Sequence, residues 1–382
     1  MKNSKYGTLI VENFGPIKKA EIDLNQVMIF IGPQGSGKSA LMKLISALYN
    51  FFSVVTPSKS SLTRILSDEF KNSILKRYDI DSYINKETYF HFDAFHCNWE
   101  FKDKKLTTML DKSKENYHPH IPLYIPAERM FFAAFSNSIQ TLLNNKIPIP
   151  DTLLNFGSKY EYAKKEITNL DLDFLDIVFK VENGNDFVYY DDDNKIFLNK
   201  SSSGMQSVIP MAIIIEYMSR ELTRGNEPYK RIETTLLPKD YFALPVDRTS
   251  AAIIEEPELN LFPTAQKGLV DFIISRLIKY HEKPHSVIIA THSPYILTSI
   301  DNLIQAGNVY EKDPRLEKKI AKIIPKECWL DFDKVTAYYI EKGKTKSILN
   351  KTERRITADK IDKVSEDLSL DFDKLLDLKY PS

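Results

Sequence analysis

Short apolar segments at the start of the chain predict three β-strands followed by a helix. The segments TLIVENF (8–14), AEIDL (20–24) and VMIFI (27–31) are rich in β-branched and aromatic residues, and turn-forming residues lie between them. In SALMKLISALYNFF (39–52) the spacing changes, because apolar residues recur every three or four positions. We therefore expect the third strand to run through a glycine-rich loop into an amphipathic helix.

The second half of the chain contains two buried strands joined by a helix. The segments SAAIIEE (250–256) and SVIIATHS (286–293) are apolar until their polar ends, and the pattern between them, 264–280, is helical. Strand, helix and strand in this order predict a parallel βαβ unit. Two further strands, FVYYD (187–191) and KIFLN (195–199), flank an acidic turn.

The region between these halves is less regular, and we interpret it as an inserted lobe with helices near 62–77 and 131–145. No heptad pattern persists there over three or four repeats, so no long coiled coil is expected. The polar segment 223–249 predicts an insertion loop, and the last residues predict a hairpin over 335–350 followed by two short helices. The predicted domains are a discontinuous α/β core (1–52 and 186–332), the inserted lobe (53–185) and a C-terminal extension (333–382).

Composition narrows the classes of protein to which the chain can belong. Its 382 residues carry 52 basic and 52 acidic side chains, and a formal net charge of zero argues against coating nucleic acid by bulk attraction. Two cysteines, Cys97 and Cys328, are too few for a disulfide framework and fit a reducing compartment. The N-terminus lacks the apolar run of a signal peptide, and the most apolar window, 205–218, is too short to span a bilayer. We expect a cytoplasmic protein without membrane contact.

The glycine-rich loop after the third strand matches the phosphate-binding pattern G-x-x-x-x-G-K-[ST]. Its glycines let consecutive backbone N–H groups converge on phosphate oxygens, and the following helix presents its positive N-terminus. In this pattern Lys38 reaches the β- and γ-phosphates, and the Ser39 hydroxyl coordinates Mg²⁺. An ordinary glycine turn is the alternative, but the flanking strand and helix favour a nucleotide site. The residues expected to contact the nucleotide are Gly32, Pro33, Gln34, Gly35, Ser36, Gly37, Lys38, Ser39 and Ala40.

Two carboxylates end the apolar strand at 250–256. A nucleoside triphosphatase needs one acid to hold Mg²⁺ and another to position or deprotonate the attacking water. We assign Glu255 to the metal and Glu256 to the water. An acidic strand end at the protein surface is the alternative, and the presence of the phosphate-binding pattern in the same chain makes it less favourable.

A histidine and a serine–glycine pair complete the candidate chemistry. His292 follows a buried strand, where an imidazole can bond the γ-phosphate or the attacking water; by itself, a structural histidine is the simpler interpretation. Ser203, Gly204 and Gln206 stand at the start of an apolar helix, where a hydroxyl and a backbone N–H make an anion site. A serine N-cap explains the same residues equally well.

In this order, the elements resemble the motif set of ABC-type ATPases. GPQGSGKS (32–39) resembles Walker A, SSGMQ (202–206) a degenerate LSGGQ signature, IIEEPE (253–258) Walker B, and ATHSP (290–294) the switch-histidine loop. The opening VENFGPIKKAEIDL and the segment EEPELNLFP are similar to the RecF/SMC/OLD-like branch of that family.

The resemblance implies an ABC-type head, which is a P-loop NTPase fold with a mixed β-sheet, an inserted helical lobe and a small C-terminal extension. It also implies ATP and Mg²⁺ as cofactors, and a head-to-tail homodimer or higher homo-oligomer that closes on two ATP molecules. Glu256 and His292 would then be catalytic in cis. Ser203, Gly204 and Gln206 would act in trans, on the γ-phosphate bound by Lys38 of the other subunit.

The chain departs from the family pattern at three places. Glu255 stands where the family has an aspartate, and Met205 replaces the second signature glycine, which predicts slow turnover. No Q-loop glutamine is evident. Glu128 and Arg129 follow a strand-like segment at the expected place, as a nucleotide contact or as a buried ion pair or packing group in the lobe.

Members of this family differ mainly in what is attached to the ATPase. The chain predicts neither a long coiled coil nor an appended nuclease, so we expect a stand-alone ATPase that controls a separate effector protein. It resembles the ATPase components of phage-defence pairs, such as the AriA-like component of the PARIS system. A RecF-like DNA repair ATPase and a non-hydrolysing ATP-sensing scaffold are the alternatives. DNA is the weaker expectation, because the basic clusters at 102–114, 318–326 and 342–355 are interrupted by acidic or neutral residues.

Overall fold

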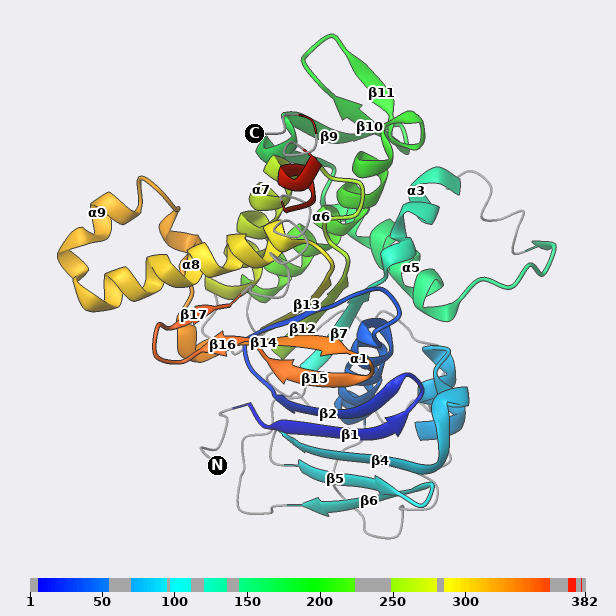
Figure 1. Ribbon diagram of the computed structural model, residues 1–382. Coiled ribbons are helices and arrows are strands. Elements are labelled where there is room, and N and C mark those ends of the chain that lie inside the picture. The colour runs from blue at the N-terminus through cyan, green and yellow to red at the C-terminus, as the bar shows by residue number, and fades with distance from the viewer. Residues whose placement is uncertain are drawn as a thin grey trace.

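The structure of the protein, a computed structural model, describes residues 6–54, 70–94, 97–110, 120–135, 144–223, 249–279, 285–357, 370–375 and 379. The insertion loop expected at 223–249 lies almost entirely outside these residues. So do parts of the helices expected near 62–77 and 131–145, and most of the two helices expected at the C-terminus. The described residues form an α/β protein in which helices cover a large mixed sheet (Figure 1), as the sequence predicts.

The main sheet has eleven strands in the order β6-β5-β4-β1-β2-β15-β14-β3-β13-β12-β7. The strands from β14 to β7 are parallel to one another, and those from β6 to β2 are antiparallel. The bounds are β1 (Thr8–Phe14), β2 (Ile17–Asp23), β3 (Val27–Ile31), β4 (Ile84–Ala94), β5 (Cys97–Lys102), β6 (Lys105–Leu110), β7 (His120–Ile125), β12 (Thr249–Glu255), β13 (Ser286–Thr291), β14 (Val335–Glu341) and β15 (Lys344–Ser347).

A second, four-stranded sheet has the order β11-β10-β9-β8 and lies beyond the helices of the upper layer in Figure 1. The turn that the sequence predicts between 191 and 195 joins β10 to β11 as an antiparallel hairpin. The remaining strands are β8 (Asn169–Leu172), β9 (Ile177–Glu182), β10 (Asn185–Tyr189), β11 (Lys195–Phe197), β16 (Leu349–Asn350) and β17 (Arg355–Ile356). The α-helices are α1 (Lys38–Val54), α3 (Met130–Phe135), α5 (Asp151–Glu166), α6 (Ser203–Thr223), α7 (Pro263–Ile274), α8 (Pro294–Lys312) and α9 (Glu317–Ile320).

The central parallel strands are apolar along their whole length because helices cover both faces. On β3, Met28 and Phe30 belong to the hydrophobic cluster that contains α1. The neighbouring Ile29 and Ile31 belong to the cluster that contains α6, α7 and α8. Successive side chains of a strand point to opposite faces, so one continuous apolar run serves two helical layers.

The described residues of the range 53–185 contribute to both hydrophobic clusters of the core. β4 to β6 extend the main sheet, since β4 pairs with β1 and places Phe92 opposite Leu9, both of which are buried. Across the cluster, Phe51 of α1 meets Trp99 of β5 edge-to-face, with ring centroids 5.4 Å apart. These strands supply aromatic side chains that enclose α1, and they are therefore part of the core. α3 and α5 do pack beside α6, away from α1.

The described residues directly after 333 also contribute to the main sheet. The hairpin expected over 335–350 is present, but its first strand, β14, lies inside the main sheet, next to β3. Ala337 lies opposite Ile29, and both side chains are fully buried. β14 thus covers one edge of β3, the strand that carries the glycine-rich loop. Among the described residues, no helix has both the length and the apolar composition needed to cross a bilayer.

We expect Ala337→Asp to destabilise the fold strongly, because it places a carboxylate without a partner at a fully buried position on a covered face of the sheet. The free energy of unfolding, measured by urea denaturation followed by circular dichroism, should fall by several kcal/mol, about 3 kcal/mol or more. Lys346→Asp on the exposed β15 is the control and should unfold like the wild type. A wild-type unfolding midpoint for Ala337→Asp would show that β14 is not an inner strand.

Candidate functional site

The register of the parallel strands brings their carboxyl ends to one level of the sheet. Ile31 at the end of β3 lies opposite Thr291 of β13, and the adjacent Ala290 lies opposite Glu255 of β12. On the outer side of β12, Ile254 lies opposite the last residue of β7. The segments that leave these strands therefore meet at one edge. They are the loop 32–39 after β3, Glu256 after β12, His292 after β13 and residues 126–129 after β7.

The loop 32–39 closes around the side chain of its own lysine. Lys38 Nζ donates to the carbonyl oxygens of Gly32 (2.8 Å) and Pro33 (2.9 Å), and only 6% of the residue is exposed. Gly37, at φ +107°, lets the loop turn into α1, and a Cβ at this position would lie 2.5 Å from Ile17 Cδ1. Only glycine fits such a backbone conformation beside the β1–β2 turn. The loop thus holds a cation at the N-terminus of a helix, which is the arrangement of a phosphate site.

The electrostatics of Lys38 depend on burial and on the neighbouring carboxylates. Burial lowers the pKa of the Lys38 ammonium to about 8, while the negative charges of Glu256, Glu258 and Glu255 act in the opposite direction. The ammonium is therefore still largely protonated at neutral pH. A bound polyanion would favour the charged form further, because opposite charges at short range stabilise one another.

Glu255 is the most buried carboxylate of the site, with 4% of the residue exposed. Tyr124 of β7 donates its hydroxyl hydrogen to Glu255 Oε1 at 2.7 Å, and the side chain of Ser39 also bonds to Glu255. Burial raises the pKa of the Glu255 carboxyl, the charge of Glu128 acts in the same direction, and the bonds from Tyr124 and Ser39 act against them. The sequence analysis missed Tyr124, whose only signal is a polar tip within an apolar strand.

Glu256 and His292 face each other beside Lys38. Glu256 Oε1 lies 3.4 Å from His292 Nε2, and the other ring nitrogen, Nδ1, lies 3.5 Å from Lys38 Nζ. The Glu256 carboxylate and the imidazole are each about 30% exposed (32% and 28%), so water reaches both. The cation, the imidazole and the carboxylate therefore form one continuous row at the strand ends.

Glu258 holds the backbone that carries His292. Its Oε1 accepts hydrogen bonds from the His292 backbone N–H (2.8 Å) and the Thr291 hydroxyl (2.7 Å). Glu256 is fixed on the same side, because its backbone N–H donates to the Ala290 carbonyl at 2.8 Å. The sequence analysis included Glu258 in the IIEEPE motif but gave it no role. Its contact with the His292 backbone N–H exists only because β12 and β13 pair side by side.

Arg129 lies beneath this row and is fully buried. Its guanidinium donates to the carbonyl oxygens of five residues at distances from 2.7 to 3.4 Å; these residues are Pro126, Ser207, Glu255, Glu256 and Pro257. Burial lowers the pKa of Arg129 to about 10, so it remains charged at neutral pH. The adjacent Glu128 is exposed. The sequence analysis considered Glu128 and Arg129 together. Arg129 donates its hydrogen bonds to backbone carbonyls of the protein.

The residues expected to act in trans lie at the start of α6, where Ser202 and Gln206 make local hydrogen bonds. The N-cap contact comes from Ser202, whose hydroxyl accepts from the Met205 backbone N–H at 3.4 Å, while Ser203 is exposed. Gln206 Nε2 donates back to the Ser201 carbonyl at 2.8 Å. Gly204 is buried against the turn after β12, where an added Cβ would lie 2.6 Å from the Asn260 carbonyl oxygen. Close packing within the chain thus requires glycine at 204.

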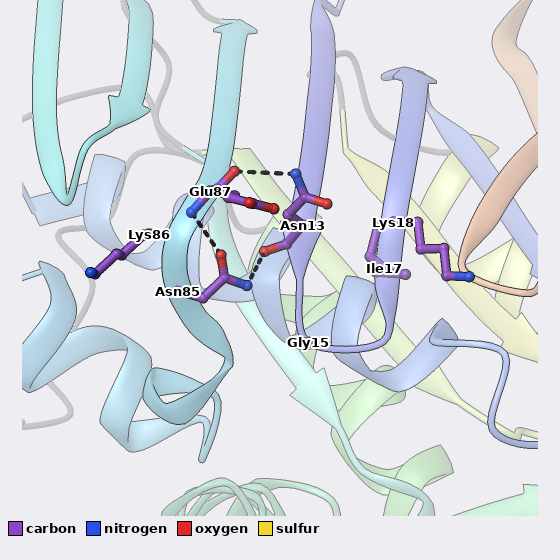
Figure 2. Close-up of a pocket in the computed structure, with 7 residues that line it drawn as sticks. All are labelled: Asn13, Gly15, Ile17, Lys18, Asn85, Lys86 and Glu87. Carbon is purple, nitrogen blue, oxygen red and sulfur yellow. Dashed lines mark hydrogen bonds between the residues drawn. The ribbon is translucent and has the colours of Figure 1, made fainter.

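A cavity of about 410 Å³ lies near the loop 32–39 but is lined by other residues. It opens between the β1–β2 turn and the start of β4, and Ile17, which packs against Gly37, forms part of its wall. Figure 2 shows Asn13, Asn85 and Glu87 joined by hydrogen bonds on one side of this cavity. The sequence analysis did not predict it. The full lining is Asn13, Gly15, Ile17, Lys18, Asn85, Lys86 and Glu87.

Comparison with known proteins gives a family match. A family model described as an AAA ATPase domain matches residues 7–121 and 102–297, which include the glycine-rich loop, both strand-end glutamates and His292. A comparison with curated protein sequences gives no significant match. Among solved structures, the chain is similar to the SMC head domain from Thermotoga maritima, with 12% identity, a TM-score of 0.37 and coverage of 77% of this chain and 91% of that chain. It is also similar to the recombination mediator protein RecF, with 10% identity, a TM-score of 0.38 and coverage of 91% and 99%.

The pKa of Lys38 predicts how anion binding depends on pH. Because the ammonium has a pKa of about 8, it loses its proton above that pH, and the affinity for ATP should be about tenfold weaker at pH 9 than at pH 7. The effect of rising pH on the free energy of unfolding has the opposite sign. Since the unfolded chain keeps this proton up to its ordinary pKa, the contribution of Lys38 to the free energy of unfolding rises between pH 8 and pH 10.5.

Titration with a fluorescent ATP analogue across this pH range measures the first effect. Lys38→Arg is the matched control, because a guanidinium stays charged at these pH values and its residual binding should not change with pH. Equal pH dependence in both proteins would assign the titration to another group.

Proposed function

Because the chain belongs to the AAA ATPase domain family, we propose that it binds ATP at the loop 32–39 and hydrolyses it slowly with Mg²⁺. The meeting of an ammonium, two carboxylates and an imidazole at the ends of three neighbouring parallel strands carries this proposal. Backbone N–H groups of the loop and the N-terminus of α1 attract the polyphosphate. Lys38 then exchanges its loop carbonyls for phosphate oxygens, which are stronger acceptors.

The residues at the end of the loop fit a divalent cation. The Ser39 hydroxyl acts on the Glu255 carboxyl by lowering its pKa, and both groups are hard oxygen donors of the kind that Mg²⁺ selects. Burial alone disfavours the charged form of Glu255, and a cation beside it would offset that cost. When bound there, Mg²⁺ supplies positive charge to the phosphates. Tyr124 keeps the carboxylate oriented toward this position.

Glu256 is the general base of the proposed reaction. Its carboxylate is accessible to water and lies against His292, which also contacts the phosphate-binding lysine. This position supports a role for His292 in orienting the attacking water or the γ-phosphate. Glu258 limits the movement of the imidazole by holding the backbone of His292.

The proposed active form is a head-to-tail homodimer. Ser203 is exposed at the N-terminus of the 21-residue helix α6, where a partner's γ-phosphate would meet a hydroxyl and a positive helix end. Phe262 and Tyr295 follow the catalytic strands and are 76% and 52% exposed, so apolar surface is available on this side for a second subunit. Met205 in place of a glycine is consistent with loose closure and slow turnover.

Closure of the dimer is proposed to control a separate effector protein, in the manner of the ATPase components of phage-defence pairs. The RecF-like alternative requires a basic surface for DNA, and the two arginines of the C-terminal basic stretch are paired with carboxylates. Arg354 bonds to Glu311 at 3.0 Å and to Asp333 at 3.3 Å, and Arg355 lies 3.6 Å from Asp301. These arginines already have acidic partners, and this favours a protein partner over nucleic acid.

Two substitutions separate ATP binding from hydrolysis. Lys38→Ala removes the main cation and should weaken ATP binding by about 100-fold. Glu256→Gln keeps the shape and all phosphate contacts, so ATP affinity should be unchanged while the rate of phosphate release falls about 100-fold or more. Glu21→Gln, an exposed carboxylate on β2, is the matched control and should behave as the wild type. If wild-type turnover does not exceed that of Lys38→Ala, the protein is an ATP-sensing scaffold.

The dimer is tested by the mass of Glu256→Gln in solution with and without Mg-ATP. The chain of 44.1 kDa should double in mass when ATP is present. Adding Ser203→Arg places a charged side chain where the partner's phosphate would lie, and this double variant should stay monomeric while binding ATP. If Glu256→Gln binds ATP and remains monomeric without the added arginine, the start of α6 is only a capped helix end and the role in trans is wrong.

A further inference from the structure

Arg129 joins three segments that are far apart in the sequence. Its Nε donates to the Ser207 carbonyl of α6 at 3.0 Å, and its Nη1 and Nη2 donate to the carbonyls of Glu255 and Glu256 at 2.7 Å each. Weaker bonds reach Pro126, at the end of β7, and Pro257. A guanidinium has five N–H donors, and the Arg129 side chain uses every one of its nitrogens on backbone carbonyls.

The bond to Glu256 falls on a strained part of the backbone. Glu256 has φ +42°, in the left-handed region that residues other than glycine seldom adopt. Such a conformation persists only where its surroundings determine it fully. Here the Ala290 carbonyl holds the N–H of Glu256, and Arg129 holds its carbonyl. This backbone conformation turns the Glu256 carboxylate toward His292.

The bond to Ser207 lies in the turn of α6 that precedes Pro210. Pro210 is inside this helix; it has no N–H for the carbonyl of residue 206, and a proline ring crowds the carbonyl four residues before it. Arg129 supplies a donor to the neighbouring carbonyl of Ser207. The start of α6, which carries Ser203, is thereby tied to the strand end that carries the catalytic carboxylates.

We propose that Arg129 is a positioning residue, which fixes the reactive orientation of Glu256 and couples it to the start of α6. This inference rests on the proposed hydrolysis for its kinetic consequence, but its structural consequence is independent of turnover. Contact at Ser203 would shift Ser207, and a rigid guanidinium would transmit that shift to the carbonyls of Glu255 and Glu256. In this role Arg129 acts through the backbone carbonyls of Ser207, Glu255 and Glu256.

Arg129→Lys is the most direct test, because lysine keeps the charge but has three donors in place of five. The loop 32–39 is untouched, so ATP affinity should stay within about threefold, while kcat falls about 100-fold through misplacement of Glu256. Amide hydrogen exchange should become faster at 207–211 and 255–259, and should remain slow in β3 and β13.

Lys159→Met is the matched control. Lys159 of α5 also donates to a backbone carbonyl, that of Pro122 in β7, at 3.4 Å, and burial likewise lowers its pKa to about 8. Its loss removes a half-buried cation that also bonds to a backbone carbonyl, without touching residues 255–257. We expect this variant to keep wild-type kcat and wild-type exchange at 255–259. A similar fall in kcat in both variants would assign the Arg129 effect to general loss of stability and would overturn the proposal.

Pro210→Ala is a second variant that should fold even if Arg129→Lys does not, because alanine favours a helix interior. It restores the helical N–H donor for the carbonyl of residue 206, and we expect the changed turn to weaken the bond between Arg129 and the Ser207 carbonyl. Exchange at 255–259 should again become faster, and kcat should fall about tenfold, by analogy with a misplaced catalytic group. Unchanged exchange and kcat in both folded variants would overturn the coupling. If the wild type does not hydrolyse ATP, the proposed function fails, and the exchange data alone decide the role of Arg129.

Discussion

The parallel pairing of β3, β13 and β12 is the constraint on which the rest of the site depends. Ile31 lies opposite Thr291 and Ala290 lies opposite Glu255, so the three strands end at one level. A slip of one residue would turn every side chain of a strand to the opposite face of the sheet. Packing in the two hydrophobic clusters prevents such a slip. Packing against helices on both faces therefore fixes the position of Lys38, Glu256 and His292 before any nucleotide is bound.

A second level of the structure fixes the orientation of these groups. Tyr124 orients Glu255, Glu258 holds the backbone of His292, and Arg129 holds the carbonyls on either side of Glu256. Tyr124 and Arg129 come from the end of β7 and Glu258 from the end of β12, and none of these contacts is local in sequence. The buried charge of Arg129 is tolerated because its donors are satisfied by carbonyl oxygens and because four carboxylates lie near it. The site is thus organised largely through backbone groups.

Long-range strand pairing decides where the segments outside the motif-bearing regions lie. Residues 84–110 and 335–347 carry ordinary strand patterns, and nothing in those patterns says which strands they join. The first group encloses α1 with aromatic side chains, and β14 covers one side of β3. Irregular sequence between two motif-bearing regions suggests a separate lobe and an extension. In the structure, however, the apolar face of α1 packs against β4 to β6, and one edge of β3 pairs with β14.

The sequence by itself determined the local chemistry of this protein. The pattern G-x-x-x-x-G-K-[ST] between a strand and a helix, the carboxylates at 255 and 256, and His292 after a buried strand all follow from short-range spacing. Only the tertiary structure decided which residues support them. Tyr124 and Arg129 act through contacts with β12 and α6, and Gly204 is needed because the Asn260 carbonyl approaches it. Such contacts depend on which elements pack side by side, and no local pattern of side chains encodes them.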